Sequence, residues 1–282
     1  MNLIDLHTHT TCSDGTYTPA ELIEYAAEKN LKAISITDHD TVSAYGEGFD
    51  LAEKFNIELI PGMEISAYYE GREIHILGYF IDLSSKELLK FLSHYVSMRN
   101  NRNLEVINLL NKENIPVTME DIRSLSGGEI TGRSHFARYL VDNGYAASVK
   151  EAFDNYLIKG KKGYSPRVLP GYKEAVEIIL GSGGIPVLAH PVMYKQTYVE
   201  CDAMVKVLKS AGLAGLEAIY SNNSAENDIN YKKIADKYSL IVTGGSDFHG
   251  LNKPGLDLGS GYGGLAVDYS ILESLKKHIS GK

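Results

Sequence analysis

A stretch near the start of the chain places the strongest constraint on its fold and chemistry. Residues 4–15 read Ile-Asp-Leu-His-Thr-His-Thr-Thr-Cys-Ser-Asp-Gly. Because a β-strand sends alternate side chains to opposite faces, His7 and His9 would share one face while the aliphatic side chains pack on the other. Gly15, the residue after Asp14, turns the chain and brings Asp14 back over the histidines. Two imidazoles and a carboxylate that converge in this way are typical metal ligands.

The same arrangement, an apolar strand followed by a histidine or an acid, recurs along the chain. Strands are predicted at 32–37, 57–60, 185–189, 213–219 and 240–243, with helices between them, and a turn is expected at 61–62. In a β/α barrel the loops after the strands build the active site. The residues that reach this rim and could bind metal ions are His7, His9, Asp14, His39, Glu64, His75, His190, Asp247 and His249.

One pair of these residues depends on the register of a hairpin. A turn at 70–71 would pair Tyr69 with Arg72 and Ser66 with His75. Glu64 and His75 would then lie diagonally on one face, within reach of a shared metal ion. A slip by one residue would send His75 to the opposite face.

The pattern changes from residue 84 onward. A helix that begins with Ser84 as its cap continues through Leu110, and further helices are predicted at 118–125, 134–143 and 149–157. We therefore expect a barrel built from 1–98 and 166–282, with a helical insertion at 99–165 that forms a cap over the substrate.

Composition limits the classes of partner. The 282 residues carry a net charge of −8, which does not favour stable binding to duplex nucleic acid. No apolar stretch is long enough to span a bilayer, the first residues lack a signal-peptide pattern, and two cysteines do not make a disulfide framework. We expect a cytoplasmic protein that does not bind membranes; the sequence does not indicate an oligomeric state.

The motifs that carry these residues, taken in order, resemble those of the polymerase and histidinol phosphatase family of metal-dependent phosphoesterases. They are Asp5-Leu6-His7-x-His9, 13–15, 37–41, 62–66, His75, 189–191 and 245–249. The resemblance implies an α/β fold, a distorted seven-stranded β/α barrel, with two or three divalent ions of manganese, iron or zinc. It assigns one ion to His7, His9, Glu64 and Asp247, a second to Glu64, His75 and His190, and a third to Asp14, His39 and His249.

The insertion is similar to one branch of that family, which removes phosphate from nucleoside 3',5'-bisphosphates and trims short RNA from the 5' end. The residues expected to bind substrate are Asp14, His39, Arg99, Arg102, Arg133, Ser134, His135, Lys161 and His249. Arg133 and Ser134 would open a helix, where free amides favour an anion, and a guanidinium grips phosphate with two hydrogen bonds. Arg99 and Arg102 could instead lie on a solvated helix face, and His135 could simply hold the helix start.

The resemblance also implies the reaction. A metal-activated water would attack phosphorus, since the chain has neither a Gly-x-Ser-x-Gly nucleophile motif nor a phosphate-binding loop. Asp40, next to His39, could carry a proton or accept a hydrogen bond from a ligand. Two alternatives remain: a phosphatase for a small non-nucleotide ester such as histidinol phosphate, and a non-catalytic module.

Overall fold

Eight strands form one curved sheet in the computed structural model, which describes residues 2–46, 48–126 and 130–281. Their order in the sheet is β7-β6-β5-β4-β3-β2-β1-β8, with β4 antiparallel to both of its neighbours. The strands are β1 (Leu3–Thr8), β2 (Ala33–Ile36), β3 (Glu58–Tyr69), β4 (Arg72–Tyr79), β5 (Ile185–Leu188), β6 (Gly215–Tyr220), β7 (Ile241–Gly245) and β8 (Val267–Asp268).

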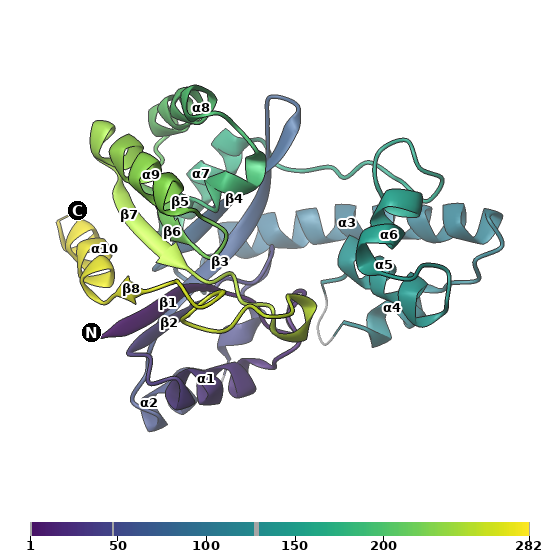
Figure 1. Cartoon of the computed structure of the whole chain (residues 1–282), viewed down its shortest axis with the longest axis horizontal. Coiled ribbons are helices and arrows are strands. Elements are labelled where there is room, and N and C mark those ends of the chain that lie inside the picture. The colour runs from purple at the N-terminus through teal and green to yellow at the C-terminus, as the bar shows by residue number, and fades with distance from the viewer. Residues whose placement is uncertain (1, 47, 127–129, 282) are drawn as a thin grey trace.

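Helices surround this sheet, and the result is the distorted β/α barrel that the family resemblance implies (Figure 1). The sheet has eight strands instead of the seven expected, because the short strand β8 pairs with β1. The barrel helices are α1 (Pro19–Glu28), α2 (Gly48–Lys54), α7 (Tyr172–Gly181), α8 (Tyr198–Ser210), α9 (Ala225–Lys237) and α10 (Ser270–Ser280). Short helical turns η1 (Ser43–Tyr45), η3 (Pro191–Tyr194) and η4 (Gly250–Asn252) lie in the loops. Among the described residues, no helix has both the length and the apolarity that a membrane crossing requires.

The barrel closes where the end of β7 meets β1. The backbone amide of Asp247 donates to the carbonyl of His7 at 2.8 Å, and the amide of His9 donates to the carbonyl of Phe248 at 2.9 Å. Gly245 allows this approach, because a Cβ at that position would lie 2.4 Å from Cβ of His7. The short strand β8 pairs with the other end of β1. Closure therefore brings the last metal-ligand motif of the sequence beside the first.

The hairpin of β3 and β4 has the expected register. Tyr69 pairs with Arg72 and Ser66 pairs with His75, and positive φ angles of 41° at Glu70 and 88° at Gly71 form the turn between them. The turn expected at 61–62 was wrong, because β3 continues through these residues. Its first part pairs with β2 and its second part with β4, so the strand changes partner instead of ending.

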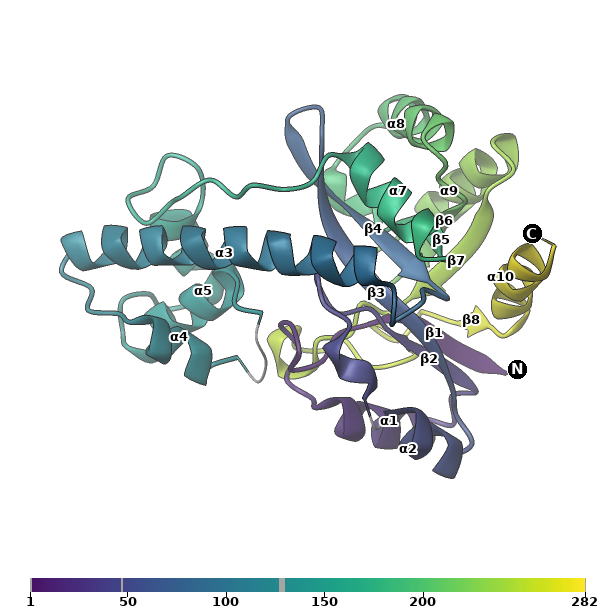
Figure 2. The same cartoon turned by 180° about the vertical axis from the view of Figure 1, so that it is seen from behind.

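Residues 86–157 form the insertion helices, which project from one side of the barrel (Figures 1 and 2). They are α3 (Lys86–Lys112), α4 (Met119–Ser124), α5 (Arg133–Asp142), α6 (Val149–Ala152) and the π-helical η2 (Phe153–Leu157). The cap of α3 is Ser85, one residue beyond the expected Ser84. A separate apolar core, which includes Leu110, Phe136 and Leu140, holds these helices together.

The limits 99–165 for a separate insertion domain stay a prediction, and 127–129 within them lie outside the described residues. Residue 99 falls inside α3, which runs without a break from the barrel into the insertion (Figure 2). A continuous helix gives the two parts a stiff connection on this side.

The contact at Gly245 generates a stability prediction. Gly245→Ala should lower the free energy of unfolding by about 1–3 kcal/mol, because the added methyl group overlaps the backbone of β1. Denaturant unfolding of the purified variant measures this. Gly181→Ala is the control, since nothing lies within 4 Å of a Cβ there; an equally stable Gly245→Ala variant would contradict the tight closure.

Candidate active site

All nine candidate metal ligands gather at the rim where the parallel strands end. His7 lies on β1, Glu64 on β3 and His75 on β4, while the others follow the ends of strands or lie on the loop after β1. Their ligand atoms form four overlapping groups in which every atom lies within 4.8 Å of the others. The groups are His9, Asp14, His39 and His249; His7, Glu64 and His190; His7, His9 and Asp247; and His39, Glu64 and His75.

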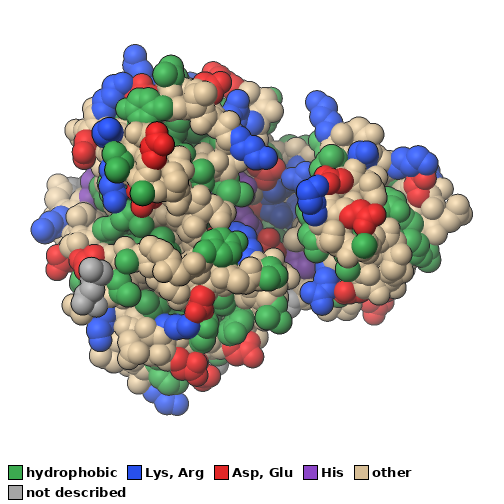
Figure 3. Space-filling model, viewed as in Figure 1, with side chains coloured by type: hydrophobic (Ala, Val, Ile, Leu, Met, Phe, Trp, Pro, Cys, Tyr) green, Lys and Arg blue, Asp and Glu red, His purple; other side chains and the backbone are tan. Residues whose placement is uncertain are grey.

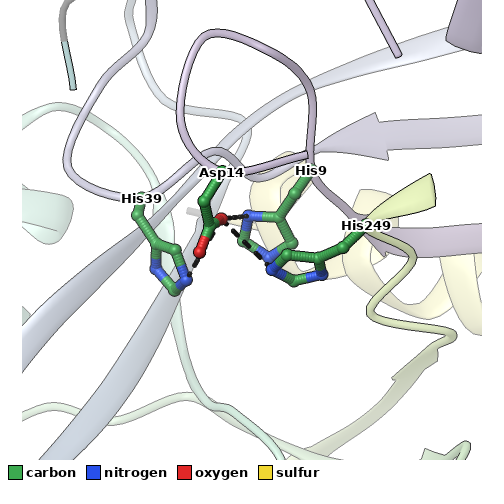
Figure 4. A group of neighbouring side chains, drawn as sticks. All are labelled: His9, Asp14, His39 and His249. Atoms are coloured by element: carbon green, nitrogen blue, oxygen red, sulfur yellow. Dashed lines mark ion pairs between the residues drawn. The ribbon is translucent and has the colours of Figure 1, made fainter. Parts of the chain in front are cut away.

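The first group surrounds the carboxylate of Asp14 (Figure 4). Asp14 Oδ1 lies 3.2 Å from Nε2 of His249, 3.9 Å from Nε2 of His39 and 3.9 Å from Nδ1 of His9. These residues come from the ends of three different strands and from the loop after β1. They could hold one cation through three imidazoles and one carboxylate.

Glu64 belongs to two of the three remaining groups, and it is fully buried. Its Oε1 lies 3.0 Å from Nδ1 of His75 and 2.9 Å from Nε2 of His190. Its Oε2 lies 3.5 Å from Nε2 of His7 and 3.3 Å from Nε2 of His9. One carboxylate therefore faces histidines on both sides, as a ligand shared by two cations would.

The contacts within the cluster fit metal ligands better than mutual hydrogen bonds. His39 Nδ1 and Glu64 Oε2 are 2.9 Å apart, yet neither atom has a hydrogen-bond partner in the part of the chain that the structure describes. The Nε2 atoms of His7 and His9 face each other at 3.2 Å. Asp14 Oδ1 and His190 Nδ1 are likewise buried without a hydrogen-bond partner. A set of imidazole nitrogens and carboxylate oxygens with free lone pairs suits divalent transition metals.

Electrostatics agree with a cation site. Burial raises the pKa of Glu64, but the neighbouring His39, His75 and His7 outweigh it and hold the pKa well below its usual value. Burial lowers the pKa of His75, whereas the Glu64 and Glu73 carboxylates reverse this effect and bring the pKa to about 10. The histidine protons here take the place that bound cations would occupy, so cation binding would release protons.

Hydrogen bonds fix the loops that carry these ligands. Asp38 accepts from the amide of Thr10 at 2.7 Å and from Oγ of Ser13 at 2.5 Å, which anchors the loop that carries Asp14. His190 and Asp247 have φ angles of 26° and 59°. Such left-handed conformations cost energy and persist where surrounding contacts enforce them, often at functional sites.

The insertion faces the metal-ligand cluster with arginines. Figure 3 shows a hollow between the barrel and the insertion where histidine and basic side chains are visible. Arg133, at the start of α5, lines a pocket of about 350 Å³ together with His39, Glu64 and His75. Arg99 and Arg102 are 6% and 5% exposed. They do not lie on a solvated helix face, which was the alternative for both.

The four arginines of this region differ in their partners. Arg99 pairs with Asp40, and Arg167 bridges Asp40 Oδ2 at 2.5 Å and Glu73 Oε1 at 2.9 Å. Arg102 is buried, and its Nε and Nη1 have no hydrogen-bond partner among the residues that the structure describes. Burial and the nearby Arg133 guanidinium lower its pKa to about 9. The cation is thus retained at neutral pH without a salt bridge among the described residues, and an anionic ligand would compensate it.

Asp40 has the environment of a hydrogen-bond acceptor. It pairs with Arg99 and Arg167, and its Oδ1 accepts from the amide of Ser66 at 3.0 Å. Burial raises its pKa, but the two arginines outweigh burial and lower the pKa below its ordinary value. Of the two roles considered, acceptor and proton carrier, the geometry favours the acceptor.

The other candidate substrate residues lie in different settings. Ser134 is half-buried in the first turn of α5. His135 accepts the amide of Gly132 at 3.0 Å through Nδ1, so it caps the helix, and burial lowers its pKa. Lys161 is exposed in the loop after η2 and does not line the pocket beside the ligand cluster. His94 is exposed on α3.

Sequence reasoning missed several residues that contact the cluster or its arginines, among them Glu73, Arg167, Glu217, Tyr220 and Lys253. Tyr220 donates to Asp247 Oδ2 at 2.7 Å, and Lys253 pairs with the same oxygen. Glu217 had a signal in the sequence, because it is the single charged residue in the apolar strand 213–219. Arg167 and Lys253 lie in loops, where a charged residue gives no such signal.

Comparisons with known proteins agree with this geometry. The PHP domain model matches residues 5–164. The chain is 35% identical to the 5'-3' exoribonuclease Rnm of Escherichia coli, over 88% of this chain and 85% of that protein. It is 31% identical to the 3',5'-nucleoside bisphosphate phosphatase of Chromobacterium violaceum, over 92% and 91% of the two chains.

A solved structure is similar along nearly the whole chain. A candidate metal-dependent phosphoesterase from Bifidobacterium adolescentis superimposes with a TM-score of 0.85 at 29% identity, covering 96% of this chain and 94% of the other. Family model, relatives and fold therefore confirm the resemblance read from the motifs. The chain belongs to the PHP domain family of metal-dependent phosphoesterases.

Proposed function

We propose that this phosphoesterase hydrolyses nucleoside 3',5'-bisphosphates and removes nucleotides from the 5' end of short RNA. The observation that carries this choice is Arg102, a buried guanidinium whose Nε and Nη1 have no hydrogen-bond partner among the described residues, near Arg133, which lines the pocket at the metal-ligand cluster. It offers a place for a phosphate other than the one that is cleaved. The two relatives described above act on substrates of these two kinds by name.

We propose two to three divalent ions of manganese, iron or zinc, held by the nine clustered residues. His7, His9, Glu64 and Asp247 would hold one ion, Glu64, His75 and His190 a second, and Asp14, His39 and His249 a third. Bound cations would supply Lewis-acid chemistry, by which a water becomes a nucleophile at neutral pH and charge on the phosphoryl oxygens is neutralised. Asp14, His39 and His249 would also border the bound substrate.

The protein groups orient the substrate. Arg133 and Arg102 would take the second phosphate, and Arg133 needs only to release a 3.4 Å contact with Glu73. Arg99 and Arg167 are engaged by Asp40 and Glu73, and they would keep those carboxylates away from the incoming anion. The 99–165 insertion would thus act as a cap that selects substrates with a second phosphate. Ser134, His135 and Lys161 stay predicted substrate contacts.

The alternative substrate is a small phosphomonoester without a nucleotide, such as histidinol phosphate. Such a substrate presents only the phosphate that is cleaved and would leave Arg102 without a partner.

We also propose a cytoplasmic location, which Cys12 and Cys201, both free, support.

Metal dependence gives the first functional prediction. The purified protein should carry two to three equivalents of transition metal, and chelation should abolish hydrolysis because the proposed nucleophile is a metal-activated water. Elemental analysis and activity before and after chelation measure this, with readdition of manganese as the control. Full activity of a metal-free preparation would contradict the proposal.

Glu64→Ala should be among the most damaging single substitutions. It removes the carboxylate that faces histidines on both sides, so both metal content and turnover should fall by at least about 100-fold. His94→Ala, on the exposed face of α3, is the control. A Glu64→Ala enzyme that retains more turnover than His94→Ala would rule out the shared ligand.

Arg102→Ala and Arg133→Ala should separate the two substrate classes. Losing one charge-assisted phosphate contact should cost about 1.5–3 kcal/mol, or roughly ten- to a hundred-fold in kcat/KM, with a nucleoside 3',5'-bisphosphate. With an aryl phosphate, which has only the scissile group, kcat/KM should change little. Both substrates are measured at matched metal content.

Arg138→Ala is the matched control, because Arg138 lies on α5 and pairs on the surface with Asp142. Equal losses with both substrates would place the arginines on the transferred phosphoryl group. No loss with either substrate would favour the non-nucleotide alternative.

A further inference from the structure

We propose that Glu217 is a positioning residue that holds two ligands of the metal centre, His7 and His190, in their binding geometry. The inference rests on the proposed function, because it takes these histidines as metal ligands. Glu217 lies on β6, is fully buried, and belongs to none of the metal-ligand groups.

One carboxylate oxygen of Glu217 fixes the ring of His7. Glu217 Oε1 lies 2.9 Å from Nδ1 of His7. The other ring nitrogen, Nε2, points into the cluster, 3.2 Å from Nε2 of His9 and 3.6 Å from Oδ1 of Asp247. A carboxylate at Nδ1 keeps the proton there and leaves the lone pair of Nε2 free for a cation.

The second oxygen holds the backbone of His190. Glu217 Oε2 accepts the amide of His190 at 2.7 Å. His190 follows β5 with a φ of 26°, a conformation that costs energy and needs support from its surroundings. This hydrogen bond fixes the turn from which the imidazole of His190 reaches Glu64 at 2.9 Å.

The two contacts make one side chain the link between three strands. Glu217 is on β6, His7 is on β1, and His190 ends β5. A fully buried carboxylate is costly unless hydrogen bonds and charge compensate it. Here each oxygen of Glu217 contacts one candidate metal ligand. Residues that orient the ligands of a metal site are expected to make such contacts.

Glu217→Gln is the sharpest test, since it preserves shape and removes one acceptor. The amide can accept from only one of the two donors, and its NH₂ group then opposes either Nδ1–H of His7 or the amide of His190. Zn²⁺ affinity, measured by competition with a chromogenic chelator, should fall by about 10–100-fold. The chelated variant should be less stable than the chelated wild type, because a buried donor loses its acceptor, and the increase of its melting temperature on adding Zn²⁺ should be smaller than in the wild type.

Glu58→Gln is the control for this change. Glu58 begins β3 at the opposite end of the barrel, where its carboxylate accepts from Tyr269 at 2.6 Å and from Lys276. That variant should bind Zn²⁺ as the wild type does. Wild-type Zn²⁺ affinity in folded Glu217→Gln, or an equal loss in Glu58→Gln, would overturn the positioning role.

If Glu217→Gln does not fold, Glu217→Asp answers the same question. Aspartate keeps the charge but is one methylene group shorter, so it cannot span both contacts, and Zn²⁺ affinity should again fall. Unchanged affinity in that variant would overturn the inference. Because the readout is Zn²⁺ binding, the result is independent of the substrate; if the wild type binds Zn²⁺ but does not hydrolyse nucleotides, only the proposed function fails.

Discussion

The carboxylate of Glu64 is the interaction on which the site depends. It is fully buried and lies within 3.5 Å of nitrogens from five histidines, which lie on or follow four different strands. A buried carboxylate is unfavourable unless positive charge surrounds it. Raised pKa values of His7, His9 and His75 favour positive charge beside it in the protein alone, and divalent cations would supply it in the enzyme. The β3–β4 hairpin brings His75 to this carboxylate, and the closure of β7 on β1 brings Asp247 beside His7 and His9.

A second network joins this centre to the insertion. Glu73 is two residues from His75 on β4, and it contacts His75, Arg133 and Arg167. Asp40 follows His39 and pairs with Arg99 and Arg167. Carboxylates beside candidate metal ligands therefore hold Arg99 of α3, Arg133 of α5 and Arg167 of the returning loop. Ion pairs thus connect the candidate metal-ligand cluster to the insertion.

Much of this arrangement could be predicted from the sequence, because strand periodicity is local. The alternation in residues 4–9 placed His7 and His9 together, and the hairpin register that joins Ser66 to His75 followed from the turn at 70–71. The error at 61–62 has a local cause too. Proline and glycine usually signal a turn, but Pro61 can stay in β3 because its carbonyl accepts from Phe80 at 2.7 Å while the strand changes partner.

The sequence by itself determined the set of candidate ligands and the alternation of strands and helices that brings them to one rim, since both depend on residue type and short-range spacing. Tertiary structure decided how each charged group is used. Arg99 and Arg102 are three residues apart on one helix. Arg99 pairs with Asp40, whereas Nε and Nη1 of Arg102 have no hydrogen-bond partner among the described residues. Glu217 contacts a histidine 210 positions away. Such differences arise from packing between distant segments, which no local pattern encodes.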